Sequence, residues 1–243
     1  MDEFDQLPFE TLRAMADAAA EVKNCRRVLA KTGDTILTEL LRGVGAPAEW
    51  RHYPPGDVYD GEYHAQYYYH SHAAAERRPG EHGHFHTFLR PLGMPAGVKP
   101  ALLPDAGRAL GENDALSHLA GISVDASGEV TRLFTTNRWV TGETWYAADD
   151  VTAMLDCFVI DHARPSWPLN RWITAVIRLY RPQIVDLLRR RDAALAEAGG
   201  LDGNPYEDRA LETPSEIEID AETHIRQVER AWRAARRRHE DRL

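Results

Sequence analysis

The histidines of this chain are concentrated in residues 63–90, which hold six of the eleven. They are His64, His70, His72, His82, His84 and His86. Four of them form two His-x-His pairs, and neutral imidazole is a good ligand for zinc, copper, nickel and iron. Side chains alternate in direction along a strand, so each pair would present both of its rings on one side of a sheet. The spacing therefore predicts a site whose chemistry depends on a bound metal.

The two pairs can serve one ion only if the strands that carry them pair in a suitable register. Tyrosines and phenylalanines flank the histidines, and a polar connection with proline and glycine separates the two runs, so an antiparallel hairpin is expected. The expected partners are His72 with His82, His70 with His84, and Tyr68 with His86. A slip of one residue would send the two rows to opposite faces, so the predicted site depends on this register.

The expected metal ligands are His70, His72, His84 and His86, with Glu81 as a nearby carboxylate. Three histidines, or two histidines and a carboxylate, with open coordination positions suit a catalytic zinc or a non-haem iron, and a ligand set of histidines alone also accepts copper. We therefore expect one divalent transition metal, iron ahead of copper or zinc. The spacing leaves open whether His82, His118 or a carboxylate completes the site.

Other residues can take part in catalysis or in substrate binding. Tyr68 falls on the histidine face and can donate a proton, although packing within the sheet is the alternative. Glu81 can tune or protonate a bound species. In the segment NRWVTGETWY, Asn137, Arg138 and Trp145 can contact a substrate, because arginine grips carboxylates and tryptophan covers apolar groups. A structural network at a strand end explains these last residues equally well.

The elements that must position these residues give an α+β fold. Apolar residues at steps of three and four predict a helix over 8–31 and a short one over 36–41, and prolines and glycines predict turns over 44–62. Two more strands are expected over 116–124 and 129–136, with His118 on the side of Ala120, Ile122 and Val124. A helix over 151–158 and a longer one after Pro168, kinked at Pro182, follow. We expect an antiparallel sheet that bears the histidine hairpin and is packed by N-terminal and C-terminal helices.

Length and charge limit the organisation and the partners. We expect one domain over 1–198, then a linker and an amphipathic C-terminal helix over 199–243 that packs on the body or on a second copy, so a homodimer is one option. The formal net charge of −9 argues against binding to nucleic acid. No apolar run approaches the roughly 20 residues that span a bilayer, and the acidic N-terminus lacks signal-peptide features. A cytoplasmic protein without a membrane partner is expected.

Two resemblances add to this interpretation. The His-x-His-x3-Glu pattern of His70, His72 and Glu76 resembles part of the first cupin motif, which would imply a metal-binding role for these three residues. Over roughly residues 50–180, the segments HYPPGDVYD, QYYYH, EHGHFHTFLR, TTNRWVTGETWY and IDHARPSWPLNRWITA resemble a family of uncharacterised bacterial proteins, a domain of unknown function. That second resemblance implies a single domain in a bacterial cytoplasm and no activity.

The first functional hypothesis is a metal-dependent oxidoreductase or oxygenase that acts on a small organic substrate. Aromatic residues crowd the histidines and no separate base is evident, which favours oxidation over hydrolysis. The alternatives are a non-catalytic protein that binds or senses metal, a zinc-dependent hydrolase, and a metal-free module that binds small anions through protonated histidines and arginines.

Overall fold

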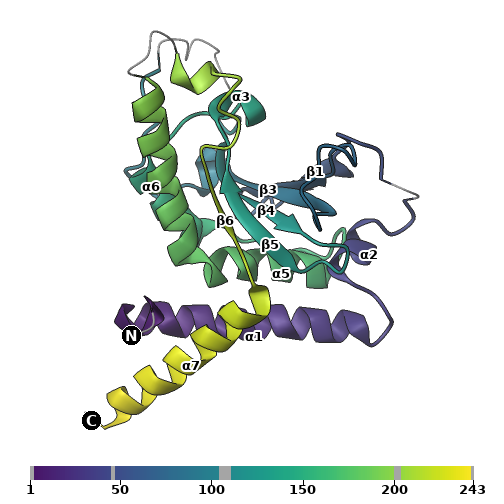
Figure 1. Cartoon of the computed structure of the whole chain (residues 1–243), viewed down its shortest axis with the longest axis vertical. Helices are drawn as coiled ribbons and strands as arrows, with labels where there is room; N and C mark the ends of the chain where they lie inside the picture. The colour runs from purple at the N-terminus through teal and green to yellow at the C-terminus, as the bar shows by residue number, and fades with distance from the viewer. Residues whose placement is uncertain (1–2, 45–46, 104–110, 200–203, 242–243) are drawn as a thin grey trace.

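The computed structural model of the chain describes residues 3–44, 47–103, 111–199 and 204–241. These residues form the predicted α+β fold, in which helices pack on one antiparallel sheet (Figure 1). The strands are β1 Tyr53–Tyr59, β2 Ala65–His70, β3 Gly83–Leu89, β4 Ser117–Val124, β5 Val130–Thr135 and β6 Ser215–Glu218. The α-helices are α1 Phe9–Ala30, α2 Ile36–Leu40, α3 Arg138–Thr141, α4 Ala148–Met154, α5 Trp167–Leu179, α6 Arg181–Ala198 and α7 Ala221–Glu240. Four 3-10 turns complete them: η1 Glu3–Gln6, η2 Pro91–Gly93, η3 Leu155–Cys157 and η4 Pro205–Glu207.

The six strands lie in the order β1-β2-β3-β4-β5-β6, and each pairs antiparallel with the next. The prediction that residues 44–62 form only turns was wrong, because β1 occupies part of this range. Two prolines fit there because β1 is an edge strand that pairs only with β2. The backbone N–H that proline lacks is therefore not needed for hydrogen bonds to a second neighbouring strand. Gly56 and Asp57 have positive φ, and the register shifts between Tyr53 and Val58, so this strand is irregular where the turn signals lie.

One face of the sheet packs on α5, and α5 lies between the sheet and α1 (Figure 1). The ring of Phe85 in β3 contacts Trp172 of α5 at a centroid distance of 5.5 Å. Tyr67 of β2 donates a hydrogen bond to Asn170 of α5 at 2.6 Å. The predicted apolar stripe of the first helix, which includes Met15, is buried in the same core. Tyr67, Tyr69 and Phe85 therefore face the core and fix which side of the hairpin the histidines that alternate with them occupy.

The single kinked helix expected after Pro168 is instead two helices, α5 and α6. Tyr180 lies between them with φ −100° and ψ 17°, which ends α5. Pro182 lies in the first turn of α6, where backbone N–H groups make no hydrogen bond within the helix. The N–H that proline lacks is therefore not needed there. The proline starts a new helix rather than bending an existing one.

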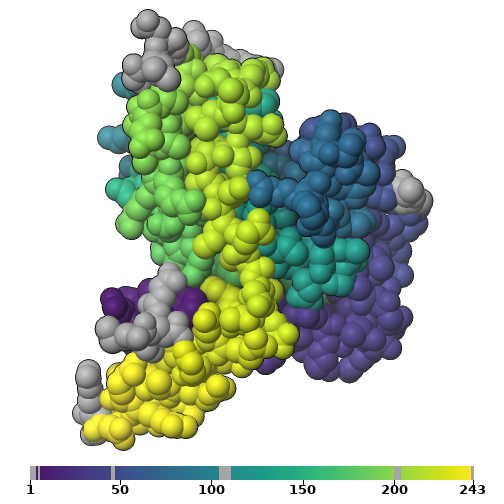
Figure 2. Space-filling model, in the orientation of Figure 1, coloured from purple at the N-terminus to yellow at the C-terminus, as the bar shows by residue number. Residues whose placement is uncertain are grey.

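The C-terminal part of the chain adds both a strand and a helix to this body. β6 pairs with β5, and α7 lies along α1, where Lys23 pairs with Glu229 at 2.7 Å and Phe9 contacts Trp232. In Figure 2 the segment that includes β6 runs down the visible face between α6 and the histidine hairpin. No helix in the described ranges is long and apolar enough to cross a membrane.

Candidate metal centre

The register of the histidine hairpin is the predicted one within the strands. His70 lies opposite His84, and Tyr68 lies opposite His86. The backbone pairing ends before the third expected pair, because β2 stops at His70 and β3 begins at Gly83. Both faces of these two strands are buried, so the histidine face is an interior surface rather than a solvated one.

Three imidazoles converge on one point. His70, His72 and His84 each offer a ring nitrogen, and the three nitrogens lie within 4.8 Å of one another. The closest two, Nε2 of His70 and Nε2 of His84, are 2.6 Å apart. With metal–nitrogen bonds of about 2.0–2.1 Å, two ligand nitrogens lie roughly 3 Å apart, so the rings need to separate only slightly to hold an ion. This cluster can therefore bind a transition metal.

The carboxylate of Glu81 fixes the orientation of one ligand. Its Oε1 lies 2.7 Å from Nδ1 of His84, and both side chains are almost fully buried. A ring nitrogen beside a carboxylate carries a proton, so Nδ1 of His84 donates to Glu81 and Nε2 is the atom of His84 that faces His70. Burial raises the pKa of Glu81, but the hydrogen bond from His84 and the positive charge of Arg132 bring it below its usual range. Glu81 is thus an ionised acceptor.

The other ligands are uncharged at neutral pH. Burial, followed by repulsion from His84, lowers the pKa of His70 to about 2. The same two causes lower the pKa of His72. A metal ion requires neutral imidazole, so the ion does not have to compete with a charged imidazolium form of these two rings.

His86, the fourth expected ligand, lies beside the cluster but has another partner. Its ring centroid is 5.2 Å from that of His70 and 5.0 Å from that of His84. Its Nδ1 is 3.1 Å from Nε2 of His118, whose Nδ1 is 3.2 Å from the hydroxyl of Thr136. Burial lowers the pKa of His86 well below its ordinary value. The three-nitrogen group does not include it.

His118 does not point the way that strand alternation predicts. The register of β3 and β4 shifts between Thr87 and Phe88, so Ala120 pairs with Thr87 but His118 pairs with Phe88. This irregularity turns His118 to the histidine face, whereas Ala120 stays in the hydrophobic core. The expectation that His118 shares a side with Ala120 was wrong because one inserted residue reverses the alternation.

His82 also departs from the expected face. Its Nδ1 contacts the hydroxyl of Tyr69, whose ring packs on Phe85 on the core side. The backbone N–H of His82 donates to Val124 of β4. His82 is therefore separated from the other histidines of its row, because it lies outside β3 and next to a glycine.

Aromatic rings cover the cluster. Trp50 stacks on His72 at a centroid distance of 4.0 Å, and His52 stacks on Tyr68 at 3.6 Å. The ring centroid of Phe134 in β5 lies 5.2 Å from that of His84, and the two rings are nearly perpendicular. A side chain at Gly121 would collide with the ring of Phe134, so glycine is needed there for that ring to lie over β4. Trp50 and His52 lie just before β1, where turn signals hide the strand, so the sequence did not indicate that their rings reach the cluster.

Tyr68 lies in the strand position opposite His86, as predicted. Its ring packs against Phe88 as well as His52, so it has the packing role that was the alternative. Burial, followed by the charge of Asp57, raises the pKa of Tyr68 well above its ordinary value. The hydroxyl keeps its proton throughout the physiological range and can serve there as a donor.

Asn137, Arg138 and Trp145 lie in a different corner, between α3, η4 and α6. The Asn137 side chain donates to the backbone of Pro205, and Arg138 pairs with Glu207. Trp145 lies under the guanidinium of Arg191, which is 4.0 Å from its ring centroid. These contacts form a structural network at a strand end, and a role of the three residues in substrate binding stays a prediction.

Glu143 is the residue of this corner that reaches a histidine. Its Oε2 accepts a hydrogen bond of 2.7 Å from the backbone N–H of His118. Burial raises the pKa of Glu143 to about 7, against the opposing charge of Arg191. The contact is with the backbone, so Glu143 supports the strand rather than the imidazole.

The cupin resemblance is not confirmed. The third member of the ligand group is His84 of β3 rather than Glu76. The sheet also has two edge strands, β1 and β6, whereas a barrel closes on itself.

The chain belongs to a family described as a domain of unknown function (DUF6969), whose profile matches residues 16–219. This agrees with the resemblance that the sequence segments suggested. No curated protein matches the chain. No solved structure matches it either.

Proposed function

We propose that this protein is a metal-dependent enzyme with one transition-metal ion held by His70, His72 and His84, and that it is an oxidoreductase acting on a small organic molecule. The observation that carries the proposal is the convergence of three ring nitrogens within 4.8 Å of one another on a buried face. Iron is the first expectation for the metal, with copper or zinc as alternatives, since imidazole suits all three.

The electrostatics of the cluster support metal binding over anion binding. The depressed pKa values of His70 and His72 mean that the rings hold no positive charge at neutral pH to attract an anion. Glu81 adds a negative charge next to His84, which favours a cation further. A metal-free site for anions is therefore the weaker hypothesis.

An enzymatic role is supported by the number of protein ligands. Three histidines leave coordination positions open, which is the arrangement of catalytic rather than structural sites. The rings of Trp50, Tyr68 and Phe134 around the cluster favour a substrate with apolar surface. Glu81 is held by both His84 and Arg132 and is not free to act as a base, which favours oxidation over hydrolysis.

A second candidate is a non-catalytic metal sensor, and the position of His86 favours it. The ring centroid of His86 lies 5.2 Å from that of His70 and 5.0 Å from that of His84, close to the 5.1 Å and 5.0 Å that separate His72 from the same two rings. If His86 exchanged its contact with His118 for the ion, four nitrogens would close the site. The two candidates therefore differ in whether a position on the metal stays open.

The test of the metal site is elemental analysis of protein purified without a histidine tag, followed by titration of apoprotein with Co(II). Wild type is expected to bind one equivalent, and His70→Ala, His72→Ala and His84→Ala to bind none at the same concentration. His239→Ala, in the exposed end of α7, is the control and should bind like wild type. Full binding by all three variants would overturn the proposed ligand set.

The open position is tested by adding azide to the Co(II) form. A shift of the ligand-field bands would indicate that an outside molecule reaches the metal, as an enzyme requires. An unchanged spectrum in wild type, together with loss of metal in His86→Ala, would favour the closed sensor site instead.

A further inference from the structure

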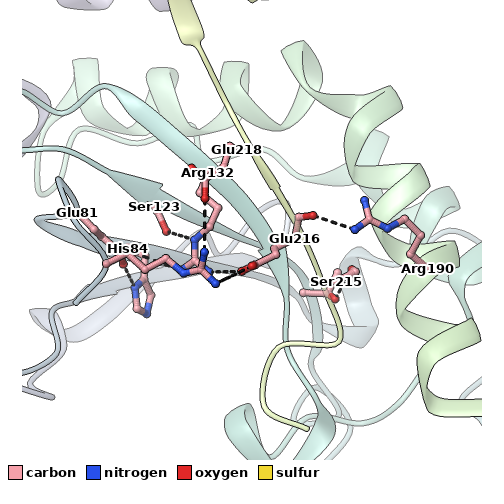
Figure 3. A network of polar contacts seen from close by, with 10 residues as sticks. Glu81, His84, Ser123, Arg132, Arg190, Ser215, Glu216 and Glu218 are labelled. Carbon is pink, nitrogen blue, oxygen red and sulfur yellow. Dashed lines mark hydrogen bonds and ion pairs between the residues drawn. The ribbon is translucent and has the colours of Figure 1, made fainter. Parts of the chain in front are cut away.

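Glu216 of β6 is held by arginines from two separate parts of the histidine hairpin and sheet. Nη2 of Arg78 lies 2.6 Å from both of its carboxylate oxygens. Nη1 of Arg132 lies 2.7 Å from Oε2 of Glu216 (Figure 3). Arg78 belongs to the connection between β2 and β3, and Arg132 belongs to β5. A carboxylate from the last strand of the sheet thus joins elements that lie far from it in the sequence.

Arg132 links Glu216 to the candidate metal centre. Its side chain is buried, and its Nη2 is 3.3 Å from Oε2 of Glu81. Nε donates to Ser123 of β4, and the guanidinium lies 4.4 Å from the ring centroid of Phe134. A buried cation is stable only when it is paired, so Arg132 depends on its two carboxylates.

Two routes therefore connect Glu216 with metal ligands. Along the first, Glu216 holds Arg132, Arg132 holds Glu81, and Glu81 accepts the proton-bearing nitrogen of His84 (Figure 3). The second runs along the chain, because Glu216 holds Arg78, which lies in the same connection between β2 and β3 as His72. Outer contacts of this kind orient ligands and commonly change metal affinity when they are removed.

We propose that Glu216 is a positioning residue for the metal site, so that β6 contributes to metal affinity although it supplies no ligand. This inference rests on the proposed metal-binding function. Because coupling between two binding events is reciprocal, metal binding also stabilises the contact of β6 with the hairpin. The last strand of the sheet is thereby part of the site.

The backbone of β6 is held independently of this side chain. Ser215 donates to the carbonyl of Leu187 in α6, and Arg190 donates to the carbonyl of Glu216 at 2.9 Å. β6 also pairs along its length with β5. A neutral glutamine at 216 is therefore expected to leave the strand in place and remove only the negative charge.

The experiment compares Glu216→Gln with Glu218→Gln in the full-length chain. Glu218 lies on the same strand and the same face, but its side chain is 73% exposed and approaches only Arg78, at 3.5 Å. Co(II) affinity is measured by competition with a chromophoric chelator, and the ligand-field spectrum of the bound form is recorded. We expect Glu216→Gln to weaken binding about tenfold or more and to alter the bands, and Glu218→Gln to stay within about twofold of wild type.

The outcomes separate the two proposals. If wild type binds Co(II) and Glu216→Gln matches Glu218→Gln in affinity and spectrum, the positioning role is wrong and the metal site stands. If wild type binds no metal, both proposals are wrong.

If circular dichroism shows that Glu216→Gln does not fold, Arg78→Gln is tested in its place, because the Arg78 side chain is half exposed. A several-fold weaker affinity in Arg78→Gln would support the role, and an unchanged one would overturn it.

Discussion

Two polar regions of this chain suggested chemistry, and they are built differently. On the histidine face, His70, His72 and His84 bring nitrogen atoms to one point. In the corner between α3, η4 and α6, the polar groups of Asn137 and Arg138 are occupied by backbone and side-chain partners. The first region gathers imidazole nitrogens around a common centre, whereas the second uses its polar groups to hold segments together. Convergence on a shared point, rather than polarity, distinguishes a candidate site from a structural network.

The largest expected effect separates the two regions by metal affinity. His84→Ala removes a ligand and should lower Co(II) affinity by more than about 100-fold, since even changes to outer contacts commonly cost 10–100-fold. Competition with a chelator measures it. Asn137→Ala, tested in parallel, should bind metal like wild type. Equal losses in the two variants would mean that the contrast between the regions does not hold.

A pH series should reveal opposite signs in the two regions. The buried histidines have depressed pKa values, so the unfolded chain takes up protons below pH 6.5 that the folded chain does not, and stability falls as pH decreases. Glu143 behaves in the opposite way. Its pKa of about 7 means that the folded chain keeps a proton that the unfolded chain loses above about pH 4.5, so its contribution to stability falls as pH rises toward 7.

Glu143→Gln isolates this second trend. The free energy of unfolding of the variant, relative to wild type, should increase by about 2–3 kcal/mol between pH 5 and pH 7, because glutamine does not ionise. Urea denaturation at the two pH values measures it. The exposed Glu112→Gln is the control and should show no such change. If the difference in the free energy of unfolding between variant and wild type stayed the same from pH 5 to pH 7, Glu143 would ionise normally in the fold.

A smaller effect is expected from Asn137→Ala on stability. The side chain is fully buried, caps α3 by accepting from the N–H of Arg138, and donates to Pro205. Loss of a cap together with a buried hydrogen bond should destabilise the fold by about 2 kcal/mol. A lower free energy of unfolding in urea, with unchanged metal content, would support a structural role. Unchanged stability with altered substrate turnover would support the predicted substrate role.

The smallest effect is expected from Arg138→Ala. Its ion pair with Glu207 is partly exposed, and such pairs contribute about 0–1 kcal/mol. Thermal unfolding and Co(II) affinity should both remain close to wild type. A large fall in affinity would connect this corner to the metal and remove the distinction drawn above.

The fold class and the histidine register could be predicted because both follow from local alternation. Phe85 and Tyr69 must face the core, and strand geometry then sends His84 and His70 to the other side. The edge strand β1 and the break between α5 and α6 were missed, since proline and glycine signals indicate an interruption without indicating what continues after it. Arg132 offered a signal that was overlooked: a charged residue among apolar neighbours in a strand needs a buried partner.

By itself, the sequence determined which histidines share a face, because the side-chain period of a strand is fixed by the backbone. It also determined the family, through segments that span most of the chain. Only the tertiary structure decided that His86 pairs with His118 and stays outside the three-nitrogen group, that a register shift brings His118 to the same face, and that Glu216 reaches the cluster through Arg132. These contacts join residues far apart along the chain or lie where strand pairing is interrupted, so no local periodicity encodes them.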